Sequence, residues 1–340
     1  MVTLVAQIAP QRSTQYAALA STLAPHELRL CVLGQQIANL ELVTLGGQDF
    51  IRFDLPDEPT PQQAEELGAL AMTSAFFIYY DKLGRIGGPL LRPIETGFEP
   101  ALPPDLVTAR RYRGKTNELF THFMCNVARA SSALRDRPWR SLRVFDPLAG
   151  GGTTLFTALM LGADVAGVES DAQDVESTVA FVKQYMREQN LPCKVRDERF
   201  KGVGKRWTFK LGSSEPKQCI LAQGDTKDSA QLITGFRPHL IVADLPYGIQ
   251  HKGQLADLLT SALPVWASIL PLGGAMALAW ESKRFGRAEM IDLVQGSAPL
   301  TVLNDPPYDA LAHRVDRVIK ERDLVVARLN EALAKERDRA

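Results

Sequence analysis

A glycine-rich turn is the first segment of the sequence whose residues are suited to chemistry. It reads Asp-Pro-Leu-Ala-Gly-Gly-Gly-Thr at residues 146–153, between two apolar runs. Glycines let the backbone approach a ligand closely, and the amides at the start of a following helix attract an anionic group. A phosphate-binding P-loop needs Gly-Lys-Ser/Thr, and no lysine lies between Asp146 and Gly162. Leu155 stands where the dinucleotide-binding pattern needs its third glycine, so the turn satisfies neither pattern.

Acidic residues follow the next two expected strands at equivalent positions. Glu169 comes directly after the apolar run 164–168, and Asp225 comes shortly after the run 219–222. An acidic side chain at the second strand end can hold a ribose diol through two hydrogen bonds. With Asp146, three acidic residues lie at three successive strand ends beside a glycine turn, which indicates a nucleoside-containing cofactor.

The turn is similar to the first motif of S-adenosylmethionine-dependent methyltransferases, D-P-x-x-G-x-G. This resemblance implies S-adenosylmethionine as the cofactor, and in that pattern the third acidic residue contacts the adenine amine. The cofactor-binding residues that it implies are Asp146, Pro147, Ala149, Gly150, Gly152, Thr153, Glu169, Ser170 and Asp225.

The fourth expected strand runs into Asp-Leu-Pro-Tyr-Gly at residues 244–248, where open α/β sheets place their substrates. This segment resembles the D/N-P-P-Y/F motif of amino-methyltransferases, which act on a planar nitrogen. The lone pair of such an amine is delocalised, and hydrogen bonds to the Asp244 carboxylate and the Leu245 carbonyl would draw it toward sp³ character. Pro246 fixes φ and helps aim that carbonyl, and Tyr247 is suited to stack on a base. Leu replaces the commoner Pro at the second position, which the chemistry tolerates because it uses only the carbonyl.

Together these motifs resemble the THUMP-associated group of RNA methyltransferases, over residues 110–329. That group contains tRNA and rRNA guanine-N2 methyltransferases, and its fourth motif is often D-x-P-Y/F-G, as at Asp244 and Gly248. The resemblance implies methyl transfer from S-adenosylmethionine to an exocyclic base amine in RNA, with N2 of guanosine in tRNA favoured over rRNA. It also implies cofactor contacts from Lys115 and Thr116, which precede the first strand.

Other kinds of protein carry related residues. A DNA adenine-N6 methyltransferase or a protein-glutamine methyltransferase uses a similar motif, which usually opens with Asn. A non-catalytic RNA-binding protein that keeps the fold is a further alternative, although intact Asp146, Asp244 and Tyr247 argue against it. A dinucleotide-dependent oxidoreductase is disfavoured because the third glycine is missing.

Residues 304–308, Asn-Asp-Pro-Pro-Tyr, look like a second copy of the catalytic motif. This copy follows the fifth expected strand, where the topology offers no cofactor methyl group. We therefore interpret it as a turn.

Basic residues gather in an insertion before the third expected strand. Residues 194–217 hold eight Lys or Arg against three Asp or Glu, with Trp207 and Phe209 among them. A basic hairpin with aromatic side chains suits phosphate contact and base stacking, although a solvated surface hairpin can have the same composition. A second basic cluster precedes the sheet. The RNA contacts that we expect are Lys205, Arg206, Trp207, Arg110 and Arg111.

The composition is that of an ordinary globular protein of 340 residues, with 45% hydrophobic and 23% charged residues. Because 39 Lys and Arg balance 39 Asp and Glu, nucleic-acid binding through bulk charge alone is disfavoured, while a local basic patch stays open. The four cysteines lack zinc-site spacing, so no metal is expected. The sequence shows no signal-peptide pattern and no apolar run near the ~20 residues that span a bilayer, so we expect a cytoplasmic protein without membrane contact.

The alternation of apolar runs and helical segments after residue 141 predicts an α/β fold. The expected strands are 142–145, 164–168, 219–222, 240–243 and 275–280, and the expected helices are 117–134, 153–161, 173–189, 255–270 and 287–293. Segments 315–319 and 324–329 predict an antiparallel hairpin that closes the sheet. The result is a Rossmann-like, doubly wound, seven-stranded methyltransferase sheet with a small N-terminal α+β domain.

The predicted domain organisation follows from these elements. We predict that residues 1–95 form the small α+β domain, with RNA binding left open as its role. The proline-rich residues 96–116 are expected to form a linker. Residues 117–329 predict the S-adenosylmethionine-dependent methyltransferase domain, and 330–340 a charged helical tail. Within the first domain the expected strands are 28–33, 50–55 and 76–80, and the expected helix is 60–72.

Overall fold

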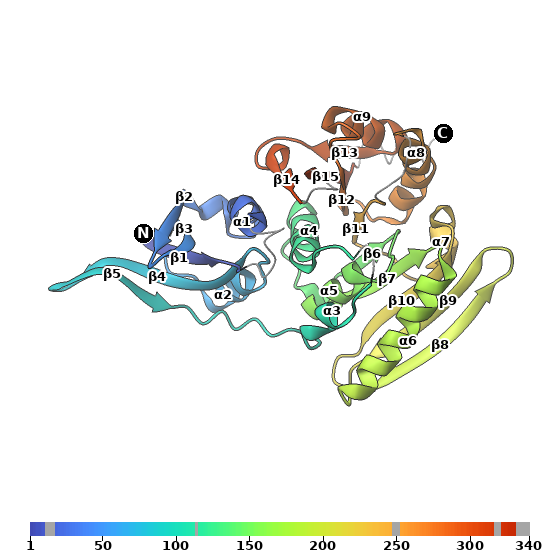
Figure 1. Ribbon diagram of the computed structural model, residues 1–340, viewed down its shortest axis with the longest axis horizontal. Helices are drawn as coiled ribbons and strands as arrows, with labels where there is room; N and C mark the ends of the chain where they lie inside the picture. Colours follow the sequence, from blue (N-terminus) through green and yellow to red (C-terminus); the bar gives the residue numbers. More distant parts are fainter. Residues whose placement is uncertain (11–17, 113–114, 247–251, 316–320, 331–340) are drawn as a thin grey trace. The chain divides into compact units, whose positions relative to one another are not determined.

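The computed structural model describes residues 1–10, 18–112, 115–246, 252–315 and 321–330. The chain forms two compact units, and each is described by itself (Figure 1). The smaller unit contains residues 1–99 and 305–322, and the larger unit contains 100–304 and the chain from 323 onward. Among the described residues, no helix combines the length and apolar character needed to cross a membrane.

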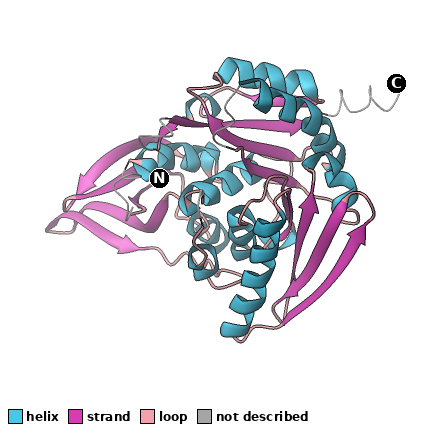
Figure 2. Ribbon diagram, turned by 45° about the vertical axis from the view of Figure 1, so that its right-hand side comes forward, coloured by secondary structure: helices cyan, strands magenta, loops and turns pink. Residues whose placement is uncertain are grey.

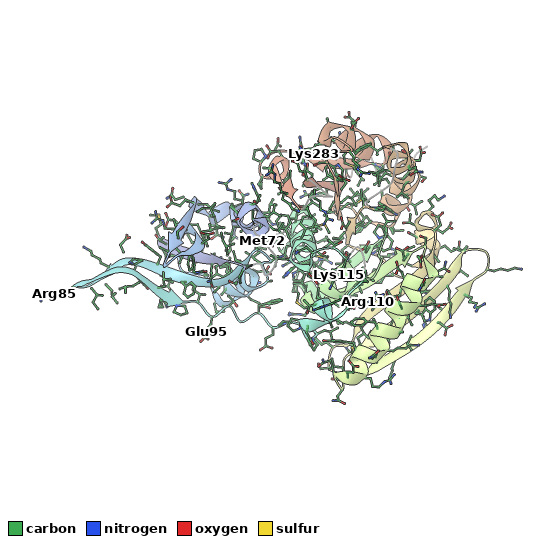
Figure 3. The ribbon with its side chains drawn as sticks, in the orientation of Figure 1. Met72, Arg85, Glu95, Arg110, Lys115 and Lys283 are labelled. Atoms are coloured by element: carbon green, nitrogen blue, oxygen red, sulfur yellow. The ribbon has the colours of Figure 1, made fainter. Side chains whose placement is uncertain are left out.

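The smaller unit is built on a five-stranded antiparallel sheet with the order β2-β3-β1-β4-β5. Its strands are β1 (Val2–Ile8), β2 (Ala38–Leu45), β3 (Gln48–Leu55), β4 (Thr73–Leu83) and β5 (Ile86–Pro93). Its helical segments are α1 (Leu19–Leu30), η2 (Gly34–Gln36), α2 (Pro61–Gly68) and η5 (Tyr308–Ala310). Helix α1 packs on β1 and β3, and α2 packs on β4, so alternate strand residues such as Leu4, Phe53 and Ile78 are buried. Arg85 lies at the tip of the β4–β5 hairpin (Figure 3).

The expected strand over residues 28–33 is wrong, because α1 continues through Leu30. Ala20, Leu23, Ala24 and Leu28 recur at helical spacing and are buried, so Leu28 belongs to the buried face of the helix. The expected helix after Thr60 is confirmed in α2, where Thr60 and Gln63 form a capping box. Strand β1 was not predicted.

The larger unit contains a predominantly parallel sheet, with the strand order β13-β15-β12-β11-β6-β7-β10-β9-β8. Its strands are β6 (Arg143–Asp146), β7 (Asp164–Glu169), β8 (Cys193–Phe200), β9 (Gly204–Leu211), β10 (Lys217–Gly224), β11 (Leu240–Asp244), β12 (Ala275–Glu281), β13 (Leu300–Leu303) and β15 (Glu321–Leu329). The short strand β14 (His313–Arg314), a part of the smaller unit, pairs with Glu321 and Arg322 at the start of β15. Strands β10, β7, β6, β11 and β12 run parallel, so the α/β fold class is confirmed.

Helices lie on both faces of the parallel strands (Figure 2). The helical segments of this unit are α3 (Asp105–Ala109), α4 (Glu118–Ser131), η3 (Trp139–Ser141), α5 (Thr153–Leu161), α6 (Ala172–Glu188), η4 (Thr226–Asp228), α7 (Ser229–Leu232), α8 (Lys252–Ile269) and α9 (Arg287–Ser297). Helices α7, α8 and α9 pack on alternate strand residues such as Phe145 and Ile241. Helices α4 and α5 pack together against β6, β7, β11 and β12, and α6 packs on β7, β8 and β10.

The sheet is larger than the seven strands expected. Strands β9 and β8 extend it beyond β10 as an antiparallel hairpin. The expected antiparallel pairing is present between β14 and the start of β15, but its place is corrected: the charged residues from Glu321 to Asp323 lie within β15, which also pairs with β13. Asp323 is buried there and forms an ion pair with Arg287, with 2.8 Å between Oδ2 and Nη1, so a charged run that predicted a turn belongs to a strand.

Some predictions lie outside the described residues. These are the segment 316–320 of the expected hairpin and the tail from residue 331 onward. The predicted domain boundaries at 95, 116 and 329 stay predictions. Contacts between residues place the segment 305–322 with the smaller unit, an arrangement that the sequence did not suggest.

Candidate active site

A cavity of about 950 Å³ opens at the carboxyl ends of β6, β7, β10 and β11, entirely within the larger unit. This volume is within the range of small-molecule sites. The predicted site residues that line it are Thr116, Asp146, Pro147, Ala149, Gly150, Thr153, Glu169, Ser170, Asp225, Asp244 and Pro246. The parallel strands thus bring residues from four separate segments to one edge of the sheet.

The glycine turn shapes one wall of the cavity. Gly150 and Gly152 have φ values of 48° and 89°, a backbone region that residues with a Cβ rarely adopt. Helix α5 begins directly afterwards at Thr153, and its N-cap residue, Gly152, forms no side-chain capping hydrogen bond. The amides at this helix start therefore carry a partial positive charge suited to a carboxylate. Gly152 supports the turn but does not line the cavity.

Tyr112 packs against this turn and lines the cavity, a contact that the sequence did not predict. A Cβ on Gly151 would lie 2.3 Å from Cζ of Tyr112, so only glycine fits beneath the ring. The Tyr112 hydroxyl lies 2.5 Å from Oγ1 of Thr153, and burial raises the pKa of this phenol. Tyr112 lies in a proline-rich segment without periodicity, so no local pattern could have identified it.

Arg110 also serves the glycine turn. Its guanidinium donates to the Gly151 carbonyl and to the hydroxyls of Thr178 and Ser177, the last at 2.7 Å. Its Cζ lies 5.0 Å from the centre of the Tyr112 ring. The predicted RNA contact of Arg110 is therefore not supported, because its donors hold the turn and α6 in place. Arg111 is exposed.

Glu169 connects the second strand to the glycine turn. Its Oε2 accepts from the Gly150 amide at 2.9 Å, and its Oε1 accepts from the Asp171 amide at 2.9 Å and the Ser170 hydroxyl at 3.1 Å. These bonds hold the carboxylate at the cavity wall. At the third strand end, Asp225 accepts from the Lys227 amide at 2.9 Å and pairs with its ammonium at 3.1 Å.

Asp146 is the most buried of the carboxyl groups in the cavity wall, with 3% of its surface exposed. It accepts hydrogen bonds from the Leu148 amide at 3.0 Å and from the Thr154 side chain. Burial raises the pKa of Asp146 to about 7, and the nearby charges of Asp244 and Glu169 act in the same direction. The group therefore changes protonation near neutral pH.

Asp244 lies at the carboxyl end of β11, and Oδ2 accepts a hydrogen bond from the Thr116 hydroxyl. This bond joins the segment before α4 to the end of the fourth parallel strand. The Leu245 side chain is buried in the core and its amide donates to the Ala279 carbonyl at 2.8 Å, so an apolar residue suits this position. Pro246 lines the cavity, whereas Tyr247 lies outside the described residues.

Lys115 does not line the cavity, contrary to the prediction of a cofactor contact. Its ammonium donates to the carbonyls of Val107 and Arg110 at 2.7 and 2.9 Å and pairs with Glu118 at 2.6 Å. Arg110 and Lys115 lie beside each other near the start of α4 (Figure 3). Lys115 therefore holds the backbone of the segment that carries Tyr112.

The charge of the cavity wall is strongly one-sided. Five lining residues are acidic, namely Asp146, Glu169, Asp174, Asp225 and Asp244, and none of the lining residues that the structure describes is Lys, Arg or His. Asp174, which the sequence prediction missed, lies in the first turn of α6 after Glu169. In the described part of the chain, no group of three or more His, Cys, Asp or Glu side chains is placed to hold a metal ion. The wall thus favours a cationic ligand.

Two further predicted RNA contacts are corrected. Arg206 is buried, because its guanidinium pairs with Glu198 and donates to the carbonyls of Leu232 and Thr234. Trp207 is also buried, and the ammonium of Lys205 lies 4.3 Å from the centre of its indole ring. Neither side chain is free to meet a base. The sequence showed the charge and the aromatic character of the hairpin but not which face each side chain takes.

No protein-family model matches this sequence, and no curated protein matches it significantly. Among solved structures, TrmN from Thermus thermophilus is 12% identical with a TM-score of 0.45, covering 97% of this chain and 100% of that chain. The rRNA methyltransferase AviRa from Streptomyces viridochromogenes is 17% identical with a TM-score of 0.42, covering 69% and 94%. The 16S rRNA N2 methyltransferase RsmC from T. thermophilus, solved with AdoMet and guanosine, is 13% identical with a TM-score of 0.37, covering 92% and 62%. These likenesses are too distant to assign an activity, so function must be argued from the residues of the cavity.

Proposed function

We propose that this chain is an S-adenosylmethionine-dependent methyltransferase that acts on an exocyclic base amine in RNA, with N2 of guanosine in tRNA as the favoured target. One observation carries the proposal: an acidic cavity joins a glycine turn to the Asp244 motif. The glycine turn supplies backbone amides, and Asp244 supplies a carboxylate for a substrate amine.

The charge of the wall separates this cofactor from a dinucleotide. S-adenosylmethionine carries a sulfonium and an ammonium, whereas a nicotinamide dinucleotide carries two phosphates. The acidic side chains around the cavity attract the first and repel the second. The missing third glycine at Leu155 leads to the same conclusion.

The residues present fit the parts of this cofactor. The amides at the start of α5 suit its carboxylate, and Glu169, held by Gly150 and Asp171, suits the ribose diol. Asp225 lies at the third strand end, where it suits the adenine amine. When bound, S-adenosylmethionine supplies a methyl group on a positively charged sulfur.

Asp244 is the proposed catalytic residue. Its Oδ2 is held by the Thr116 hydroxyl, which orients the carboxylate toward a substrate amine that donates a hydrogen bond to it. The Leu245 carbonyl is a second acceptor for that amine, and Pro246 restricts the backbone there. As the amine gains the methyl group, Asp244 takes the proton that nitrogen must release. Tyr247, the proposed stacking residue, follows directly in the sequence.

The preference for guanosine in RNA rests on the D-x-P-Y-G form of the motif. The test is to incubate the protein with isotope-labelled S-adenosylmethionine and unmodified tRNA, rRNA or DNA, and to identify the labelled nucleosides by mass spectrometry. We expect N2-methylguanosine from tRNA, lost in Asp244→Ala. Label in N6-methyladenine from DNA would overturn the RNA assignment, and a cofactor-binding protein that labels no nucleic acid would overturn the base-amine assignment.

A further inference from the structure

The acidic cavity raises the question of how an RNA substrate approaches it. Each phosphate of RNA carries a negative charge, and the ionised acidic side chains of the cavity wall repel it. Affinity for nucleic acid comes mainly from cations that meet phosphates. The β8–β9 hairpin and its flanks supply such cations, because residues 194–217 hold eight Lys or Arg against three Asp or Glu.

The hairpin runs from the outer edge of the sheet to the cavity. Strand β8 is the terminal strand on that side of the larger unit, as the yellow-green arrows of Figure 1 show. The turn between β8 and β9 reaches the cavity, since Val203 is one of the lining residues. Next to it, Lys205 pairs in register with Gln223, another lining residue. Charges along β8 therefore end beside the proposed site.

Two cross-strand pairs in this hairpin bring like charges together. Lys194 stands directly opposite Lys210, and Arg199 directly opposite Lys205. Like charges in this position destabilise a sheet unless another group offsets them. Lys205 is offset by Asp197 at 3.2 Å. Within the described part of the chain, no acidic side chain forms an ion pair with Lys194, Arg199 or Lys210.

The acidic side chains of the hairpin are already engaged. Glu198 pairs with the buried Arg206, and Asp197 pairs with Lys205. Arg196 approaches Glu198 only to 3.9 Å and keeps 70% of its side chain exposed. Lys194, Arg199 and Lys201 are also exposed. Four exposed cations of the edge strand β8 and of the turn after it, Lys194, Arg196, Arg199 and Lys201, together are named the basic track.

We infer that the basic track binds the phosphate backbone of the RNA substrate and leads it to the cavity. This inference rests on the proposed function. Lys194 and Arg196 lie on one face of β8, Arg199 lies on the other, and Lys201 lies in the turn that follows, so the track offers cations along the edge strand rather than a single point of contact. A phosphate strand supplies the negative charge that the repelling pair Lys194–Lys210 lacks. Charged residues on an edge strand also prevent strand-to-strand association, and the experiment separates the two roles.

The test is the triple variant Lys194→Glu, Arg196→Glu, Arg199→Glu in the full chain. Two of the changes turn repelling cross-strand pairs into attracting ones, so the melting temperature and S-adenosylhomocysteine affinity should be retained. RNA affinity, measured by fluorescence anisotropy with an unmodified tRNA, should fall at least about 10-fold at low salt. The slope of log K against log salt should decrease in magnitude by about 2 to 3, for three lost phosphate contacts.

The control variant is Lys82→Glu, Arg85→Glu, which reverses two exposed cations on the β4–β5 hairpin of the smaller unit. Its RNA affinity and salt slope should stay near those of the wild type. An equal loss in both variants would show that binding follows net charge and would overturn the inference. Unchanged RNA binding in the triple variant, in a protein that still methylates RNA, would assign the track to edge protection alone. A wild-type protein that neither binds nor methylates RNA contradicts the proposed function instead.

Discussion

The two D-x-P-Y segments of this chain have nearly the same sequence and different surroundings. Asp244 follows β11, lines the cavity with four other carboxylates, and accepts from Thr116. Asp305 belongs to the smaller unit, where its carbonyl accepts from the Tyr308 amide at 2.9 Å at the start of η5. The second segment thus forms a turn, as the sequence predicted. The position of such a motif in the fold, and not its sequence alone, therefore decides whether its carboxylate can take part in chemistry.

The same substitution in both segments tests most strongly whether Asp244, and not Asp305, acts in methyl transfer. Asp244→Asn should lower kcat for methyl transfer by about 10³-fold, because an amide neither takes the proton nor attracts the substrate amine as a carboxylate does. Asp305→Asn should leave kcat unchanged. Single-turnover transfer of labelled methyl groups measures both, and similar losses in the two variants would contradict the assignment of the site.

Glu169 tests whether the carboxylates around Asp244 form a cofactor site. Glu169→Gln removes the charge and weakens the bonds to Gly150 and Asp171, so the Kd for S-adenosylhomocysteine should rise about 10- to 100-fold. Glu176→Gln, which changes an exposed residue of α6, is the matched control and should leave the Kd for S-adenosylhomocysteine unchanged. Isothermal titration calorimetry measures both values. Equal affinities in the two variants would remove Glu169 from the site.

The Thr116 hydroxyl, which donates a hydrogen bond to the Asp244 carboxylate, is a second feature that sets Asp244 apart from Asp305. Thr116→Val removes the donor to Oδ2 while keeping the side-chain shape, so kcat should fall about 10-fold with KM for the cofactor nearly unchanged. Thr116→Ser keeps the hydroxyl and should restore kcat. A rise in cofactor KM without a change in kcat would instead support the cofactor contact that the sequence predicted.

A further expected effect concerns stability and pH. Burial raises the pKa of Asp146 to about 7, above the ordinary 3.8, so its stabilising contribution is complete below about pH 4 and is lost as pH rises through 7. Asp146→Asn cannot ionise, so its free energy of unfolding relative to wild type should increase between pH 4 and 8. The increase is on the order of a few kcal/mol, at about 1.4 kcal/mol per pKa unit.

Chemical denaturation at several pH values measures this difference. Burial lowers the pKa of His239 and of His313 to about 4, so their contributions to stability are lost as pH falls. These histidines act in the opposite sense to Asp146, but they are present in both proteins and cancel in the difference. A difference that does not change with pH would mean that Asp146 is ionised throughout this range.

The parallel core was predictable because its signals are local. Apolar runs bounded by glycine and acidic residues identify β6, β7 and β11, and the expected helix 153–161 matches α5. Long-range features were not predictable from such signals. The bond from Thr116 to Asp244, the packing of Tyr112 on Gly151 and the burial of Arg206 each depend on how distant segments meet.

Local signals also misled where burial depended on a partner. The run 28–33 looked like a strand, but helical spacing with Ala20 and Ala24 places its first residues in α1. Asp323 looked like part of a turn, but its ion pair with Arg287 allows it to be buried in β15. In both cases the residues that decide the structure lie outside the segment whose local pattern gave the prediction.

Binding of S-adenosylhomocysteine tests the central claim most directly. Isothermal titration calorimetry of the full chain measures the affinities for S-adenosylhomocysteine and, separately, for NAD. The first ligand has no phosphate and the second has two, so the acidic cavity should separate them. The account predicts one S-adenosylhomocysteine bound per chain, retained in Asp244→Asn and weakened in Glu169→Gln, and no binding of NAD. Binding of NAD without S-adenosylhomocysteine would contradict both the cofactor assignment and the methyl-transfer chemistry built on it.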